Sequence, residues 1–185
     1  MRKLILALAV IVSAAVVTTR AQDTNGLRTV IENFESQTNV IMVRGFGVVG
    51  SVSIGNGIIS VRSKESININ LGQKAYGVVI ELGGEALPRQ RAVIDEDELE
   101  SLLGGLDYLR TITADVTAMP AFEAHYDTKD GLRFLALGSR RQSGIQYFLR
   151  FEDGARFDLN SDELTQIRNL VSQARNAINS LKGAK

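Results

Sequence analysis

The chain of 185 residues contains no cysteine and no tryptophan, two prolines and a single histidine. Without cysteine it can form no disulfide, thiolate nucleophile, zinc–cysteine site or lipid-modified cysteine. One histidine excludes a multi-histidine metal site, and a Ser-His-Asp triad would have to use His125. Two prolines also exclude a proline-rich or low-complexity chain. The sequence therefore describes a domain that depends on its core for stability.

The first 21 residues have the pattern of a secretory signal peptide. Arg2 and Lys3 precede an apolar run at 4–17, and Ala21 follows Arg20 as the small residue at a cleavage position. The run is shorter than the roughly 20 apolar residues that span a bilayer, so we predict cleavage after Ala21 rather than an uncleaved anchor. We expect a periplasmic or secreted protein that meets the membrane only through this segment, before cleavage.

Cleavage changes the charge of the chain. The whole sequence has 21 basic and 21 acidic residues. The predicted signal peptide carries Arg2, Lys3 and Arg20 and no acid, so the mature chain has a formal net charge of −3. This mildly acidic balance argues against a nucleic-acid partner.

Composition divides the chain into three parts. A polar lead-in at 22–38 separates the signal peptide at 1–21 from a single domain at 39–185. One short apolar pattern in the lead-in fits either a short helix or a mobile segment. In that domain, β-branched runs are separated by turn residues such as Asp130-Gly131 and, after Gly83-Gly84, by a loop that includes Pro88. Strands in runs favour an α+β fold with antiparallel β-sheets over parallel βαβ winding.

Two amphipathic helices complete the predicted domain. Asp95 with Glu98, and Asn160 with Glu163, predict capping boxes where these helices begin. Each helix has an apolar stripe on one face. The first stripe contains Gly104-Gly105, which indicates either close contact with another element or a kink.

The two halves of the domain resemble each other. The segment 94–99 matches 159–164 at a constant offset of 65 residues, and each half ends with a hairpin, a cap and a helix. This pattern predicts two β-run-plus-helix repeats, at 40–118 and 119–185. Capping residues common to any strand-to-helix junction would explain the match without duplication, and both explanations stay open.

Two groups of residues resemble ligand-binding motifs. Gly45, Gly47 and Gly50 spell G-x-G-x-x-G, but a strand-like segment follows in place of the helix that would hold a pyrophosphate. We interpret them as bulges and turns of a glycine-rich sheet. The acidic run at 95–100 lacks the spacing of a calcium loop and suits a helix start. We therefore predict no cofactor and no metal.

Two further groups resemble reactive or nucleic-acid-binding surfaces. His125 lies between Glu123 and Asp127 on one face of a predicted strand, where these carboxylates would be about 13 Å apart, too far for glycoside chemistry. The other group combines arginines with aromatic residues, as a stacking and phosphate-binding surface would. We interpret it as a solvated sheet face with aromatic residues in the core. It consists of Arg140, Arg141, Arg150, Arg156, Tyr147, Phe148 and Phe151.

Several segments resemble a family of exported bacterial proteins of unknown function. They are 44–52, 76–81, 95–109 and 122–126 with Thr128-Lys129. The resemblance extends over most of the mature chain and implies export, but it brings no activity and no site residues. Strand runs that end in a packed helix are also similar in topology to Whirly-type folds, a likeness that implies binding of single-stranded nucleic acid.

The sequence thus predicts a non-enzymatic binding or structural module of the cell envelope. We expect its partner to be an envelope protein or a small ligand, and no catalytic, cofactor-binding or metal-binding residue is assigned. Two alternatives stay open. One is an enzyme that uses carboxylates or His125, and the other is a Whirly-like protein that binds single-stranded nucleic acid.

Overall fold

The computed structural model describes residues 29–55, 57–84, 87–141, 144–152 and 154–183. The predicted signal peptide lies outside these residues. The described part confirms the α+β prediction, with two four-stranded antiparallel sheets in which consecutive strands are neighbours. No helix among the described residues is both long and apolar enough to cross a membrane.

The order of elements is the same in both halves, strands followed by a helix. The first sheet contains β1 (Met42–Ile54), β2 (Gly57–Asn68), β3 (Gln73–Gly84) and β4 (Leu87–Asp95), and the second contains β5 (Ala121–Asp127), β6 (Arg133–Ser139), β7 (Ile145–Arg150) and β8 (Arg156–Leu159). The helices are α1 (Val30–Glu35), α2 (Leu99–Thr111) and α3 (Ser161–Gly183), with short 3-10 turns η1 (Glu96–Glu98) and η2 (Ala114–Val116).

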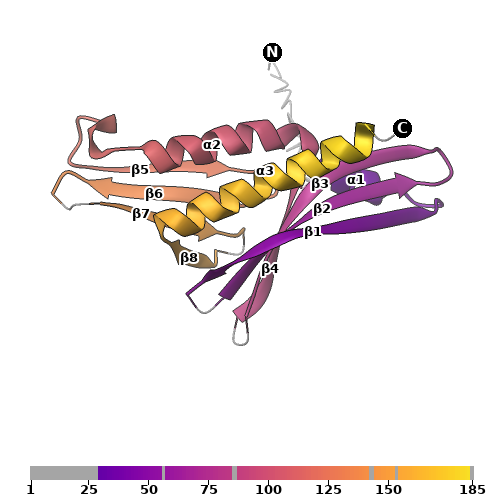
Figure 1. The fold of residues 1–185 in the computed structure, drawn as a ribbon, viewed down its shortest axis with the longest axis horizontal. Coiled ribbons are helices and arrows are strands. Elements are labelled where there is room, and N and C mark those ends of the chain that lie inside the picture. The colour runs from indigo at the N-terminus through magenta and orange to yellow at the C-terminus, as the bar shows by residue number, and fades with distance from the viewer. Residues whose placement is uncertain (1–28, 56, 85–86, 142–143, 153, 184–185) are drawn as a thin grey trace, which may run out of the picture.

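The two long helices are exchanged between the sheets (Figure 1). Helix α2 follows the first sheet but contacts β5 and β6 of the second, whereas α3 follows the second sheet and lies across β1, β2 and β3 of the first. The two helices also contact each other, and their apolar faces join both sheets in one hydrophobic core. Neither sheet is therefore covered only by the helix that follows it in sequence.

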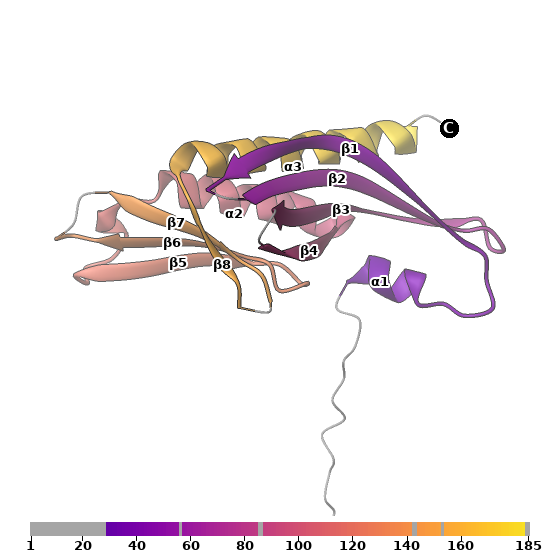
Figure 2. The ribbon, with the colours of Figure 1, turned by 90° about the horizontal axis from the view of Figure 1, so that it is seen from below.

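Helix α1 lies on the opposite face of the first sheet from α3 (Figure 2). Its buried Ile31 packs against β3, where a Cβ added to Gly77 would be 3.2 Å from Ile31 Cδ1. The short helical pattern predicted in the lead-in is thus a docked helix. The first sheet has helices on both faces.

The predicted loop that follows Gly83-Gly84 and includes Pro88 is shorter in the structure than we expected. Gly83 and Gly84 lie within β3, and Pro88 lies within β4. Because β4 is an edge strand, proline there can leave the strand pairing intact. The strands are therefore longer than their turn-forming residues indicate.

The two predicted capping boxes have different outcomes. Glu163 N–H donates to Asn160 Oδ1 at 2.8 Å, and Asn160 N–H donates to Glu163 Oε2 at 2.7 Å, which confirms the second box. The first box is wrong, because the Asp95 side chain makes no capping hydrogen bond to the helix that follows it. Its carboxylate is used by another element.

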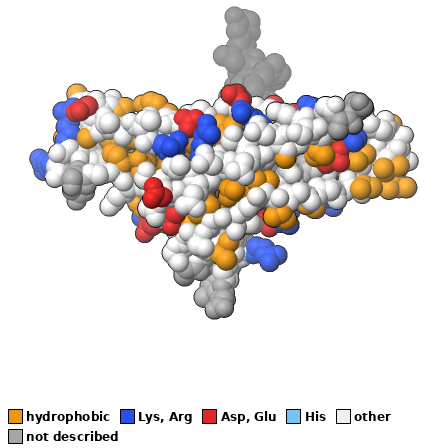
Figure 3. All heavy atoms as spheres, viewed as in Figure 1, with side chains coloured by type: hydrophobic (Ala, Val, Ile, Leu, Met, Phe, Trp, Pro, Cys, Tyr) orange, Lys and Arg blue, Asp and Glu red, His pale blue; other side chains and the backbone are white. Residues whose placement is uncertain are grey.

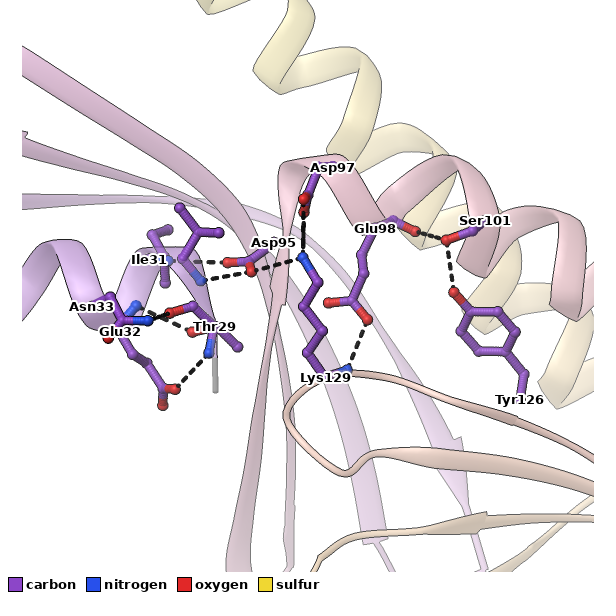
Figure 4. A network of polar contacts seen from close by, with 11 residues as sticks. Thr29, Ile31, Glu32, Asn33, Asp95, Asp97, Glu98, Ser101, Tyr126 and Lys129 are labelled. Carbon is purple, nitrogen blue, oxygen red and sulfur yellow. Dashed lines mark hydrogen bonds and ion pairs between the residues drawn. The ribbon is translucent and has the colours of Figure 1, made fainter. Parts of the chain in front are cut away.

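Asp95 joins the first turn of α1 to the β5–β6 turn (Figure 4). Its carboxylate accepts hydrogen bonds from the N–H groups of Val30 at 2.7 Å and Ile31 at 3.0 Å, and Lys129 Nζ lies 3.3 Å from it. The Lys129 N–H donates to Glu98 Oε1 at 2.8 Å. Burial raises the pKa of the Glu98 carboxyl above its ordinary value. These acidic residues therefore hold the two halves and α1 together.

Candidate binding edge of the first sheet

The first half of β1, Met42–Val48, is the most exposed strand segment of the fold, and we call it the free edge. β1 is an outer strand of its sheet, and every residue from Val43 to Val48 is exposed. Val48 is 85% exposed. An outer strand presents a row of backbone N–H and C=O groups that another strand can pair with.

Alternation along the free edge shows which backbone groups point outward. The Ile69 N–H donates to the Ile41 carbonyl at 3.0 Å, so odd-numbered residues of this segment direct their backbone groups toward β2. The backbone N–H and C=O groups of Arg44, Phe46 and Val48 consequently point away from β2, toward the open side of the strand. These residues are in position to pair with an added strand.

A β-bulge at Val49 ends the free edge. The pairing register with β2 shifts between Val48 and Gly50. A Cβ added to Gly50 would lie 2.7 Å from Leu170 Cδ2 of α3, so the strand passes beneath the helix at this point. The G-x-G-x-x-G residues thus lie in a bulged strand that continues as strand, as we predicted.

Apolar and cationic side chains share the outer face of the free edge, by which we mean the face on the α1 side of the sheet. The Phe46 ring, 49% exposed, lies 5.4 Å from the Arg62 guanidinium and 6.0 Å from Lys64 Nζ. Arg44 Nε lies 3.1 Å from a Glu35 oxygen of α1, and the buried Lys64 Nζ lies 2.7 Å from the other. This arrangement presents an aromatic ring and a half-exposed arginine beside the outward backbone groups.

Glu35 is held ionised by its neighbours. Burial alone would raise the pKa of its carboxyl, but hydrogen bonds from Lys64 and Ser66 and the charges of Lys64 and Arg44 lower that pKa below the ordinary value. Helix α1 is therefore attached to the face of β1 and β2 by a charged contact.

An apolar tip continues the free edge toward the β2–β3 turn. Its members have large apolar side chains that are at least 45% exposed, and Figure 3 shows orange side chains gathered at this end of the molecule. The tip is an exposed apolar area separate from Phe46 and Val48, because alternation places Val43 on the other face of the strand. The tip consists of Ile41, Val43, Ile69 and Leu71.

The other three edges formed by the described residues carry features that block strand pairing. On β4, the Val93 N–H donates to Asp130 Oδ2 at 2.6 Å. β5 carries Glu123, His125 and Asp127 on one face, and β8 has only four residues. Charges, short length and local caps are the usual protections of outer strands. β1 has a single charged residue, Arg44, in 13 positions.

His125 has the exposed position that the sequence predicts. Its Nδ1 lies 3.6 Å from Glu123 Oε1 and its Nε2 lies 3.6 Å from Asp127 Oδ2, while Asp127 also accepts a hydrogen bond from Arg133 at 2.7 Å. Among the residues described, no three metal-ligating side chains are grouped closely enough to hold an ion. The expected carboxylate separation of about 13 Å is wrong, because both side chains turn toward the His125 ring and their oxygens lie closer together than that. The three residues form a charged strip on an outer strand.

The arginine and aromatic group is divided between two faces of the second sheet. Tyr147 and Phe151 belong to the core, as predicted. Phe148 is buried as well, but outside the main core cluster, because alternation turns its ring to the opposite face, where the Arg156 guanidinium lies 4.2 Å from the ring centroid. That face also carries Asp158 of β8, so its charge is mixed.

Sequence reasoning did not find the free edge. Residues 42–54 contain one charge, a signal that was present, but strand order decides whether such a strand is central or outer. The chain matches no protein-family model, and no curated protein or solved structure is significantly similar to it.

Proposed function

We propose that the mature chain is a non-enzymatic binding module of the cell envelope that binds a polypeptide partner by strand addition to the free edge. One observation carries this proposal: a paired strand has six consecutive exposed residues, Val43 to Val48, and an unpaired side. In strand addition, backbone hydrogen bonds supply affinity and alternate side chains supply specificity. The signal-peptide pattern at 1–21 supports the location.

The shape of the free edge favours a polypeptide over a small ligand. The outward groups of Arg44, Phe46 and Val48 recur at every second residue, which is the repeat of an extended chain. Phe46 and Val48 provide apolar contact on the outer face. A partner segment with alternating apolar side chains would match both features.

Two substitutions of the same kind test the proposal. Val48→Lys places a charge on the free edge, whereas Met119→Lys places one at another exposed apolar position, before β5. Mature protein is crosslinked in the envelope fraction, and the attached polypeptides, including copies of the chain itself, are identified by mass spectrometry. We expect Val48→Lys to lose these partners and Met119→Lys to keep them. Equal capture by both folded variants would refute strand addition at β1.

Export is tested separately. Cell fractionation should find the protein outside the cytoplasm, and amino-terminal sequencing should begin at Gln22. A protein that keeps Met1 in the cytoplasm would contradict the envelope assignment without affecting the binding edge.

A further inference from the structure

We infer that the strand added to β1 is the β1 strand of a second copy, related to the first by a two-fold axis at Gly45. The inference rests on the proposed function, because it names the partner strand. The pairing would join two four-stranded sheets into one sheet of eight strands. Such an isologous contact uses the same surface on both copies and leaves no free edge exposed.

The register follows from the outward backbone groups. In an antiparallel two-fold pairing, the even-numbered residues of the free edge form the hydrogen-bonded pairs. An axis at Gly45 places Arg44 of each copy opposite Phe46 of the other, and Met42 opposite Val48. The cation of Arg44 would then lie beside an aromatic ring twice in the interface.

Neighbouring registers are less complementary. An axis at Arg44 would set two guanidinium groups directly opposite each other, which is unfavourable in a cross-strand pair. An axis at Phe46 would pair the two rings but leave Arg44 opposite the apolar Val48. The Gly45 axis alone, among these three, gives every outward residue a partner that suits its chemistry.

The other face of the strand also permits close approach at this axis. Gly45 and Gly47 have no side chains, and a Cβ added to Gly45 would meet nothing within 4 Å. In the paired strands, Gly45 of one copy would lie opposite Gly45 of the other in a non-hydrogen-bonded pair, with Cα atoms about 4.5 Å apart. The open space is at Gly45, on the proposed axis, whereas a Cβ added to Gly47 would lie 2.6 Å from Ser63 Oγ.

A single cysteine tests both the partner and the register. The chain has no cysteine, so the thiol of Gly45→Cys can form a disulfide only with another copy. The expected Cα separation of about 4.5 Å lies within the range of disulfides. We expect a crosslinked dimer on non-reducing gels. The control is Gly104→Cys on α2, an exposed position with equally open space, which should stay a monomer on the gel.

The mass in solution gives an independent measurement. Light scattering of the mature protein over a dilution series should give twice the monomer mass, Val48→Lys should give the monomer mass, and Met119→Lys should match the wild type. Circular dichroism identifies variants that fail to fold. A monomeric wild type, or crosslinking of Gly45→Cys no faster than that of Gly104→Cys, would overturn the inference.

The outcomes separate this inference from the proposed function. If the wild type is monomeric but Val48→Lys still loses an envelope polypeptide, strand addition stands and the second copy is wrong. If Val48→Lys retains every crosslinked partner and the wild-type mass, both proposals fail.

Discussion

Two adjacent glycines of α2 should respond differently to the same substitution. Gly104 is exposed, and a Cβ added there would meet nothing within 4 Å. Alanine in a helix interior is favoured over glycine by about 1 kcal/mol. We therefore expect Gly104→Ala to raise the free energy of unfolding by about that amount.

Gly105 is the point where α2 approaches β5. A Cβ added to Gly105 would lie 2.8 Å from Tyr126 Cγ, and the Tyr126 hydroxyl is held by Ser101 Oγ at 2.8 Å. The ring is therefore restrained against moving away. Overpacking of this kind costs about 1–3 kcal/mol. Because the gain in helix propensity is common to both variants, Gly105→Ala should be less stable than Gly104→Ala by about 1–3 kcal/mol.

Urea unfolding of the mature protein, followed by circular dichroism, measures this difference. In thermal unfolding it corresponds to about 2–4 °C per kcal/mol for a chain of this size. A Tyr126→Ala background should remove the penalty of Gly105→Ala, because the ring that obstructs the methyl group is gone. Equal stability of the two alanine variants would refute the close approach of α2 to β5. It would also favour the kink as the reason for the glycine pair.

Four more predictions concern charge, capping and the unity of the fold. Because the pKa of Glu35 is lowered, its ionised carboxylate stabilises the fold above the ordinary pKa of 4.5, and this stability is lost as the pH falls. In urea unfolding, the free energy of unfolding of Glu35→Gln should therefore fall less on acidification than that of the wild type. The raised pKa of Glu98 has the opposite effect on stability, which falls as the pH rises through 4.5 and the carboxyl loses its proton. Glu98→Gln should therefore be at least as stable as the wild type near pH 7 in the same urea titration. Asn160→Ala should lower the free energy of unfolding by about 1 kcal/mol in urea, because it removes the α3 cap. Segments 22–118 and 119–185 expressed separately should lack cooperative thermal unfolding, because each sheet is covered by the other half's helix.

Local patterns in the sequence predicted the elements well. The apolar stripe predicted for α2 is buried, and on β5 the residues Phe122, Ala124 and Tyr126, which alternate with the exposed Glu123, His125 and Asp127, pack against the core. These periods depend only on the geometry of a helix or strand. The fold class therefore followed from the sequence.

The partners of those elements could not be predicted in the same way. An apolar stripe shows that α2 is buried but does not show that it covers β5 and β6 instead of the strands before it. Asp95 and Asn160 stand at equivalent offsets, yet only Asn160 caps its own helix, because α1 presents N–H groups that the Asp95 carboxylate accepts. Such choices depend on contacts between distant segments, which a local pattern does not contain.

The free edge follows from the direction in which α3 crosses the first sheet. The helix contacts β1, β2 and β3, and its Leu170 meets β1 at Gly50, beyond the bulge. At its other end, Lys182 Nζ lies 5.9 Å from the centroid of the Tyr76 ring of β3. An oblique helix that passes from Gly50 to Tyr76 leaves the start of β1 uncovered.

Exposure of that segment is thus a consequence of the helix exchange, whereas its scarcity of charge is a property of its own sequence. A merely uncovered outer strand would be expected to carry protective charges, as β5 does. The combination in β1 is therefore better explained by a strand partner than by the crossing of α3 alone.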